Sequence, residues 1–130
     1  MITRKDESKR EAFVWLLYKT FFLFAKRMRK MKIFEYNFES PYILTQTTFN
    51  NVPAVYVVYS VINGKTVWLD VGETDKLGDR LSNHERKNCW VSNAQGNEIY
   101  VGVIQISDEF TRKNTEADLR NRLLPICGEK

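Results

Sequence analysis

An alternating run of apolar and polar residues from Ala54 to Thr74 constrains the fold of this chain more than any other segment. It reads AVYVVYSVINGKTVWLDVGET, with Asn63-Gly64 near its centre. Alternation with period two around an Asn-Gly pair is typical of a β-hairpin, because both residues tolerate the left-handed backbone of a tight turn. The segment is therefore predicted to form two antiparallel strands.

Two registers of this hairpin can be compared. A two-residue turn at Asn63-Gly64 mixes polar and apolar residues on both faces. A three-residue loop pairs Val57 with Leu69 and places mostly apolar side chains on one face of the hairpin. Because a slip of one residue moves every side chain to the other face, burial favours the second register. It predicts that Tyr56 lies opposite Asp70 on the face away from the core.

The segments after the hairpin predict helix, strand and helix in turn. Asp75 is expected to cap a helix from Lys76 to about Arg86. Residues 98–106 have the pattern of a third strand, and a helix over about 111–124 is expected to stop at Pro125. The order β-β-α-β-α predicts an α+β domain over residues 52–130, with a small, mainly antiparallel three-stranded sheet flanked by helices. Residues 31–51 are predicted to be an extended connector that holds one edge strand at most.

Residues 1–30 are predicted to be a basic and apolar helical extension. Their apolar run, residues 12–25, is interrupted by Lys19 and is shorter than the roughly 20 residues that span a bilayer. Three interpretations stay open. In the first, the extension is a helix packed on the domain or on a neighbouring protein. In the second, it is a basic and aromatic helix that lies on a membrane surface. In the third, translation starts at Met31 and the native protein lacks these residues.

The charge balance suits an anionic partner without identifying one. The chain carries 20 Lys and Arg against 16 Asp and Glu, a net charge of +4, which is compatible with phosphate binding. Its two cysteines, Cys89 and Cys127, argue against a disulfide framework and for a reducing, cytoplasmic location. A zinc site with His84 is disfavoured, because the spacing lacks paired ligands. The preferred interpretation is that the two cysteines are free thiols buried near Trp90.

The order of motifs over residues 52–130 resembles the GIY-YIG nuclease domain. The first family signature corresponds to Ala54-Val55-Tyr56 and the second to Asp70-Val71-Gly72. The family's arginine, histidine and metal-binding glutamate correspond to Arg80, His84 and Glu116.

Two positions depart from the family pattern. Asp70 replaces the tyrosine of the second signature, and Gly128 replaces the asparagine of a Pro-x-x-Asn ending. The combination DVGE, H-x-RK-x-CW and P-x-CG looks like a subgroup of short bacterial members in which both changes are usual.

The resemblance implies a metal-dependent endonuclease that hydrolyses DNA phosphodiesters. One Mg²⁺ or Mn²⁺ ion held by Glu116 would polarise the scissile phosphate. Tyr56 would activate or orient water, Arg80 would hold the phosphate, and His84 would move a proton or donate to the phosphate. Asp70 stays open: it could accept the proton of Tyr56, add a metal ligand, or repel phosphate.

Ordinary structural roles stand beside these functional ones. Glu116 could form an i,i+4 ion pair with Arg120, and Tyr56 could be a packed strand aromatic. Lys76 and Lys87 are expected to join Arg80 in binding nucleic acid. The alternatives to a nuclease are a nucleic-acid-binding module that has lost turnover, and an interaction domain that uses the N-terminal helix to contact a protein or a membrane.

Overall fold

The computed structural model describes residues 29–128, and the chain divides into two compact units, Met1–Lys30 and Met31–Lys130. The predicted N-terminal helix, with its three interpretations, lies outside the described residues. Within residues 29–128, no helix is both long and apolar enough to cross a membrane.

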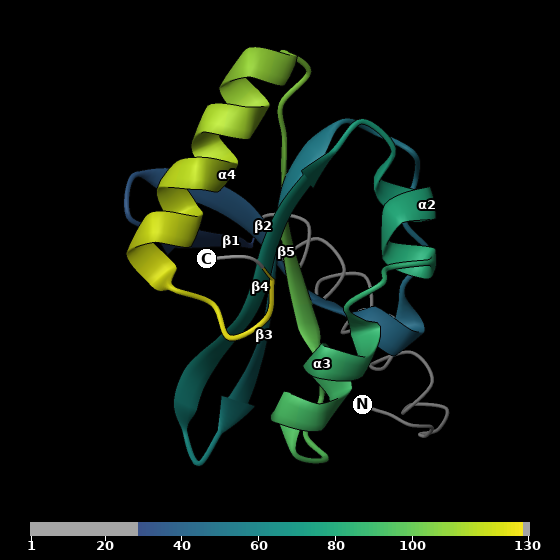
Figure 1. Ribbon diagram of the computed structural model, residues 1–130, viewed down its shortest axis with the longest axis vertical. Coiled ribbons are helices and arrows are strands. Elements are labelled where there is room, and N and C mark those ends of the chain that lie inside the picture. The colour runs from purple at the N-terminus through teal and green to yellow at the C-terminus, as the bar shows by residue number, and fades with distance from the viewer. Residues whose placement is uncertain (1–28, 129–130) are drawn as a thin grey trace, which may run out of the picture. The chain divides into compact units, whose positions relative to one another are not determined.

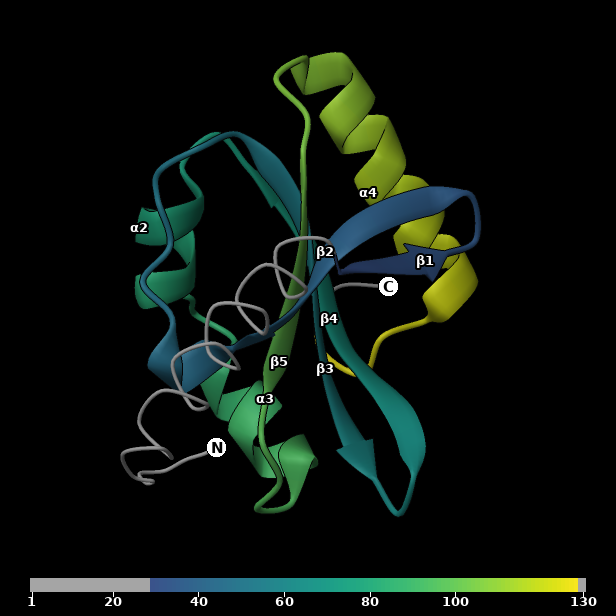
Figure 2. The same cartoon turned by 180° about the vertical axis from the view of Figure 1, so that it is seen from behind.

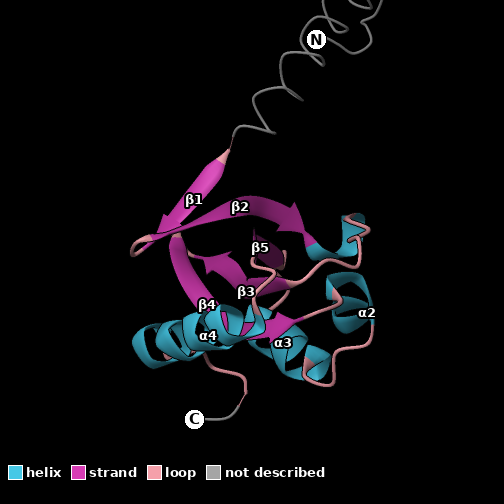
Figure 3. Ribbon diagram, turned by 90° about the horizontal axis from the view of Figure 1, so that it is seen from above, coloured by secondary structure: helices cyan, strands magenta, loops and turns pink. Residues whose placement is uncertain are grey.

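An antiparallel sheet of five strands forms the centre of the second unit (Figure 1), in the order β1-β2-β5-β3-β4. Seen from above, the sheet curls (Figure 3). The strands are β1 (Lys30–Ile33), β2 (Tyr36–Ile43), β3 (Ala54–Ile62), β4 (Lys65–Thr74) and β5 (Tyr100–Gln105). The prediction of a three-stranded sheet flanked by helices is therefore wrong, because the expected connector supplies two further strands.

Strand β2 belongs to the core rather than to a connector. Its Phe38 is fully buried, and the hydroxyl groups of Ser40 and Tyr59 are hydrogen-bonded at 2.6 Å. The strand pairs with β5, and its register shifts between Glu39 and Tyr42. Proline is tolerated at such irregular places in a sheet. Pro41 therefore interrupts the ladder without ending the strand.

The β3-β4 hairpin has a two-residue turn rather than the predicted three-residue loop. Asn63 and Gly64 have φ angles of 53° and 78°, and Ile62 pairs with Lys65. These left-handed values are the ones that an Asn-Gly turn supplies at low cost. The alternation of apolar and polar residues cannot by itself separate the two turns, because both faces of β3 are buried.

A bulge then changes the register along the rest of the hairpin. The pairing shifts at Val58, so that Val58 pairs with Asp70 and Tyr56 pairs with Gly72. The predicted cross-strand pair of Tyr56 and Asp70 is therefore wrong. Leu69, the extra residue of the bulge, packs in the same core cluster as Tyr56, which fits the way a bulge re-aims neighbouring side chains.

Helices cover both faces of this sheet, as Figure 1 and Figure 2 show from opposite sides. Helices α2 (Leu77–Ser82) and α3 (Lys87–Ala94) contribute Leu77, Leu81 and Trp90 to one core cluster, whereas α4 (Glu109–Leu123) contributes Leu119 to the other. Tyr56 belongs to the first cluster and is fully buried. The expectation that it lies on a face away from the core is wrong.

The predicted helix from Lys76 to Arg86 is divided in two. Helix α2 ends at Ser82, and α3 begins at Lys87. No side chain caps α2 at Lys76, so Asp75 is not its cap. The Asn51 side chain instead accepts the backbone N–H of Asp79 at 2.8 Å. The break places the loop of residues 83–86 beside the edge of β4, where the candidate site lies.

Candidate active site

A pocket of about 520 Å³ opens beside β4, the edge strand of the sheet. Helices from both faces reach this edge, so residues far apart in the sequence meet there. The pocket is lined by Tyr56, Gly72, Glu73, Arg80, Arg86, Glu116, Ala117, Arg120 and Asn121.

The structure brings most of the predicted site residues together. Tyr56, Arg80 and Glu116 line the pocket, and His84 lies directly behind the hydroxyl of Tyr56. Asp70 is fully buried and does not line the pocket.

The two lysines expected to bind nucleic acid lie elsewhere. The Nζ atom of Lys87 donates to the carbonyl of Ser82 at 3.1 Å, and Lys87 lines a second pocket of about 400 Å³. Lys76 is exposed just before α2 and lines neither of these pockets.

Gly72 makes room for the tyrosine of the site. A Cβ atom at this position would overlap the hydroxyl group of Tyr56. The glycine of the second signature is therefore required by close packing against the phenol ring, and its own φ lies outside the left-handed region. Glycine is the ordinary choice where another group approaches the backbone so closely.

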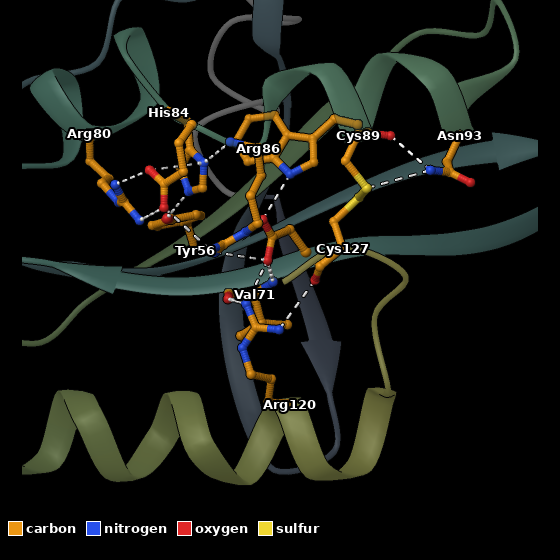
Figure 4. Close-up of polar contacts among 12 residues, drawn as sticks. Tyr56, Val71, Arg80, His84, Arg86, Cys89, Asn93, Arg120 and Cys127 are labelled. Atoms are coloured by element: carbon orange, nitrogen blue, oxygen red, sulfur yellow. Dashed lines mark hydrogen bonds and ion pairs between the residues drawn. A yellow bond between two sulfur atoms is a disulfide. The ribbon is translucent and has the colours of Figure 1, made fainter. Parts of the chain in front are cut away.

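His84 is a hydrogen-bond donor to Tyr56 (Figure 4). The backbone N–H of Arg86 donates to Nδ1 of His84 at 3.1 Å, which makes Nδ1 an acceptor. The hydrogen of the neutral ring is thus assigned to Nε2, which lies 2.8 Å from the phenolic oxygen of Tyr56. Burial lowers the pKa of His84 to about 4, helped by the guanidinium groups of Arg80 and Arg86. The ring is therefore neutral at physiological pH.

Burial also sets the protonation of Tyr56. It raises the pKa of the phenol to about 12, against the opposing effect of the nearby Arg80 guanidinium. Tyr56 is a neutral phenol near pH 7. Its oxygen already receives the Nε2 hydrogen of His84, so the phenolic hydrogen remains available to donate.

Asp70 holds two arginines and a tryptophan. Its Oδ2 atom accepts from Arg86 Nε at 2.7 Å and from Trp90 Nε1 at 2.8 Å, and its Oδ1 atom accepts from Arg120 Nη2 at 2.6 Å. The backbone N–H of Val71 adds a fourth donor at 2.8 Å. A buried carboxylate needs such compensation. This arrangement leaves Asp70 no free lone pair for a metal or for the proton of Tyr56. The roles of metal ligand and of proton acceptor, both left open by the sequence, are therefore disfavoured.

The edge of β4 is covered by Arg120 and by the C-terminal segment. Arg120 donates to the carbonyls of Val71 and Cys127, while the backbone N–H of Cys127 donates to the carbonyl of Leu69 at 2.8 Å. In Figure 4, Arg86 and Arg120 approach this strand from opposite sides. The carbonyls of Leu69 and Val71 on the edge strand thereby find partners.

Cys89 and Cys127 form a disulfide between α3 and the C-terminal segment, with Cα atoms 6.1 Å apart. The expectation of free thiols is wrong, because no cysteine is left unpaired in the part of the chain that the structure describes. The bond also removes the zinc alternative with His84, since zinc binds thiolates. The tail that carries Cys127 is thus tied to the helix that carries Trp90.

Glu116 is the carboxylate of the pocket least committed to a partner. Its Oε2 atom lies 3.7 Å from Nε of Arg120, the i,i+4 ion pair considered from the sequence, and its side chain is 28% exposed. Burial raises its pKa. Glu73, the other lining carboxylate, accepts from Nε of Arg112 at 2.7 Å.

Among residues 29–128, no three His, Cys, Asp or Glu side chains gather as a ready metal site. A single carboxylate is nevertheless sufficient for Mg²⁺, which keeps several waters and takes further oxygens from a bound phosphate. Glu116 fits an ion of that kind, because its carboxylate lines an open pocket and its ion pair with Arg120 is long, at 3.7 Å.

Sequence reasoning assigned no role in the site to two of the three arginines in the pocket, and it named Arg120 only as an ion-pair partner of Glu116. Arg86 and Arg120 are 16 and 50 residues from Asp70, and no periodicity links residues at those separations. Comparisons with protein-family models, with curated proteins and with solved structures found no match.

Proposed function

We propose that this chain is a divalent-metal-dependent endonuclease of the GIY-YIG type that hydrolyses DNA phosphodiesters. The observation that supports the proposal best is the meeting of Tyr56, Arg80 and Glu116 in one pocket, with His84 hydrogen-bonded to the tyrosine. A phenol, a guanidinium and a carboxylate in this arrangement supply a group to orient water, a group to hold phosphate and a ligand for a metal.

Glu116 would hold the metal ion in this proposal. When bound, Mg²⁺ or Mn²⁺ supplies polarisation of the scissile phosphate and stabilisation of the leaving oxygen. The carboxylate must be ionised to act as a ligand, and Arg120 opposes the effect of burial by lowering its pKa. The ion pair with Arg120 also keeps the carboxylate at the wall of the pocket.

The other residues act on the phosphate and on water. Arg80 offers a planar fork of donors to the phosphate oxygens. Tyr56 donates its phenolic hydrogen and orients water as a neutral group. It becomes a base only where additional positive charge lowers its pKa from about 12. The Nε2 hydrogen of His84 is already placed to stabilise a phenolate.

Nicking of supercoiled plasmid and cleavage of single-stranded DNA, with Mn²⁺ or with EDTA, tests the proposal. We expect nicking by the wild type in Mn²⁺ only, and a loss of at least about 100-fold in Glu116→Gln and Tyr56→Phe. Glu109→Gln is the matched control, because Glu109 is an exposed carboxylate on the same helix. Equal nicking by wild type and Glu116→Gln would disprove the assignment of the metal ligand.

A nucleic-acid-binding module without turnover is the second candidate. Asp70 favours it, because this carboxylate replaces the tyrosine of the second signature and is fully engaged in ion pairs. The module would bind DNA with a marked salt dependence and with little effect of metal. DNA binding by a protein that does not nick in either metal would select this alternative.

The cytoplasmic location expected from the sequence is part of the same proposal. The disulfide between Cys89 and Cys127 provides a way to test that location. Disulfides persist in oxidising compartments and are rare in the cytosol. Acid quenching of intact cells followed by thiol alkylation reads the redox state of Cys89 and Cys127. Free thiols in the cell agree with the cytoplasm, whereas a protected pair assigns the protein to an oxidising compartment.

A further inference from the structure

Arg86 is oriented toward the pocket by Asp70. Two of its nitrogens, Nε and Nη2, donate to the buried carboxylate at 2.7 and 3.3 Å. This two-point contact fixes the plane of the guanidinium, because two parallel donors on one carboxylate hold the two groups coplanar. The remaining nitrogen, Nη1, is thereby directed away from Asp70.

That third nitrogen lies beside Glu85, a carboxylate shared with Arg80. Arg80 binds Glu85 through Nη1 and Nη2 at 2.7 and 3.2 Å, and Nη1 of Arg86 lies 3.4 Å from the same carboxylate. Both arginines also line the pocket, whereas Glu85 does not. Two guanidinium groups from different segments thus converge on one anion.

Glu85 is a replaceable anion. Its side chain is 59% exposed, and it lies in the loop between α2 and α3. Exposed ion pairs contribute little to stability. A phosphodiester offers two oxygens to the same donors, and its binding to protein cations also releases counterions from DNA.

We infer that Arg80 and Arg86 form a clamp for a DNA phosphodiester, in which Glu85 engages donors of both guanidinium groups until the phosphate displaces it. Asp70 is the positioning residue of the clamp, since it orients Arg86. The inference rests on the proposed function only in that both use this pocket. It assigns a phosphate contact to Arg86 and a competing role to Glu85, and it requires no cleavage.

Fluorescence anisotropy of a labelled DNA duplex, measured in EDTA over a range of salt concentrations, tests the clamp without cleavage. The exposed pair Lys113 and Glu109, 2.9 Å apart on α4, provides matched controls for the same changes of charge. Glu85→Gln should bind about fivefold more tightly than wild type, and Glu109→Gln less than twofold more tightly.

Arg86→Gln should bind about tenfold more weakly and should reduce the salt slope of binding by about one, whereas Lys113→Gln leaves the slope nearly unchanged. Asp70→Asn should reduce the slope by the same amount, with no further reduction in the double variant with Arg86→Gln. A merely structural role of Asp70 would not produce this shared loss. Thermal melting identifies any variant that fails to fold, and Glu85→Gln, which changes no buried group, then carries the test.

Each result is decisive for one idea or the other. Absence of DNA binding by the wild type, or an affinity of Glu85→Gln equal to that of Glu109→Gln, overturns the clamp. If Mn²⁺-dependent nicking persists in that case, the proposed nuclease stands without the clamp. If the binding differences appear but no nicking is found, the clamp stands and the nuclease does not.

Discussion

The imidazole of His84 donates its Nε2 hydrogen to the phenolic oxygen of Tyr56 over 2.8 Å. Nδ1 of the same ring accepts the backbone N–H of Arg86 at 3.1 Å. The single hydrogen of the neutral ring therefore lies on Nε2, which makes Nε2 the donor to Tyr56. An imidazolium has no acceptor nitrogen, so protonation would break the contact with Arg86. The protonation of His84 is therefore coupled to the loop that carries Arg86 and to the position of Tyr56.

The free energy of unfolding should fall as the pH drops from about 6.5 to about 4. Burial lowers the pKa of His84 from 6.5 to about 4. In this window the unfolded chain binds a proton that the folded chain does not, so stability increases with pH and is complete above 6.5. The expected contribution is about 2–3 kcal/mol. Urea unfolding of wild type and His84→Gln at several pH values checks it, and a difference that stays constant from pH 4 to 7 would contradict it.

Asp70→Asn should destabilise the fold by about 3–5 kcal/mol, because it removes the charge that balances two partly buried guanidinium groups. Asp118→Asn is the control. It makes the same change in a side chain that is 37% exposed and paired with Arg122 and Tyr36, and it should cost much less than Asp70→Asn. Urea denaturation at pH 7 measures both. Similar costs for the two variants would show that Asp70 is not the centre of the network.

Gly72→Ala should displace Tyr56, since the new Cβ would overlap the phenolic hydroxyl. We expect a cost of about 1–3 kcal/mol, typical of overpacking in a core. The ¹⁵N resonance of His84 Nε2 should move as its hydrogen bond is lost. Removal of the ring provides the control. In a Tyr56→Ala background the same glycine substitution should be nearly neutral, and a cost that persists there would assign the effect to the backbone.

Reduction of the disulfide should lower stability by about 2–4 kcal/mol, because the bond closes a loop between cysteines 38 residues apart. The double variant Cys89→Ser/Cys127→Ser should unfold at the same lower urea concentration whether or not a reductant is present. Oxidised wild type should unfold at a higher concentration, which drops on reduction. A wild type that is indifferent to reductant would show that the cysteines are not paired in solution.

Local chemistry accounts for the elements that were predicted well. The Asn63-Gly64 pair marks the hairpin turn, and Pro125 follows the end of α4 at Leu123. Both depend on backbone preferences of one or two residues. The register was predicted incorrectly because the prediction assumed one buried face. Tyr56 and Val57 point to opposite faces, and both are fully buried.

Two elements could not be predicted from local pattern. Strand β2 contains Pro41, which normally argues against a strand, and its pairing with β1 and β5 and the burial of Phe38 stabilise it. Helix α3 is a short segment without a clear apolar stripe, and Trp90 gives it a place in the core by packing beside Leu81 and donating to Asp70. In both cases stabilising contacts come from residues distant in sequence.

The resemblance of Tyr56, Arg80, His84 and Glu116, in order and spacing, to the motifs of the GIY-YIG domain nominated the candidate site from the sequence, and the hairpin around Asn63-Gly64 followed from turn chemistry. The tertiary structure alone decided the role of Asp70. A buried carboxylate takes its partners from whatever donors the packing brings near. Here the loop before α3 brings Arg86, and helix α4 on the opposite face of the sheet brings Arg120, to the edge of β4. No local pattern of residues encodes this encounter.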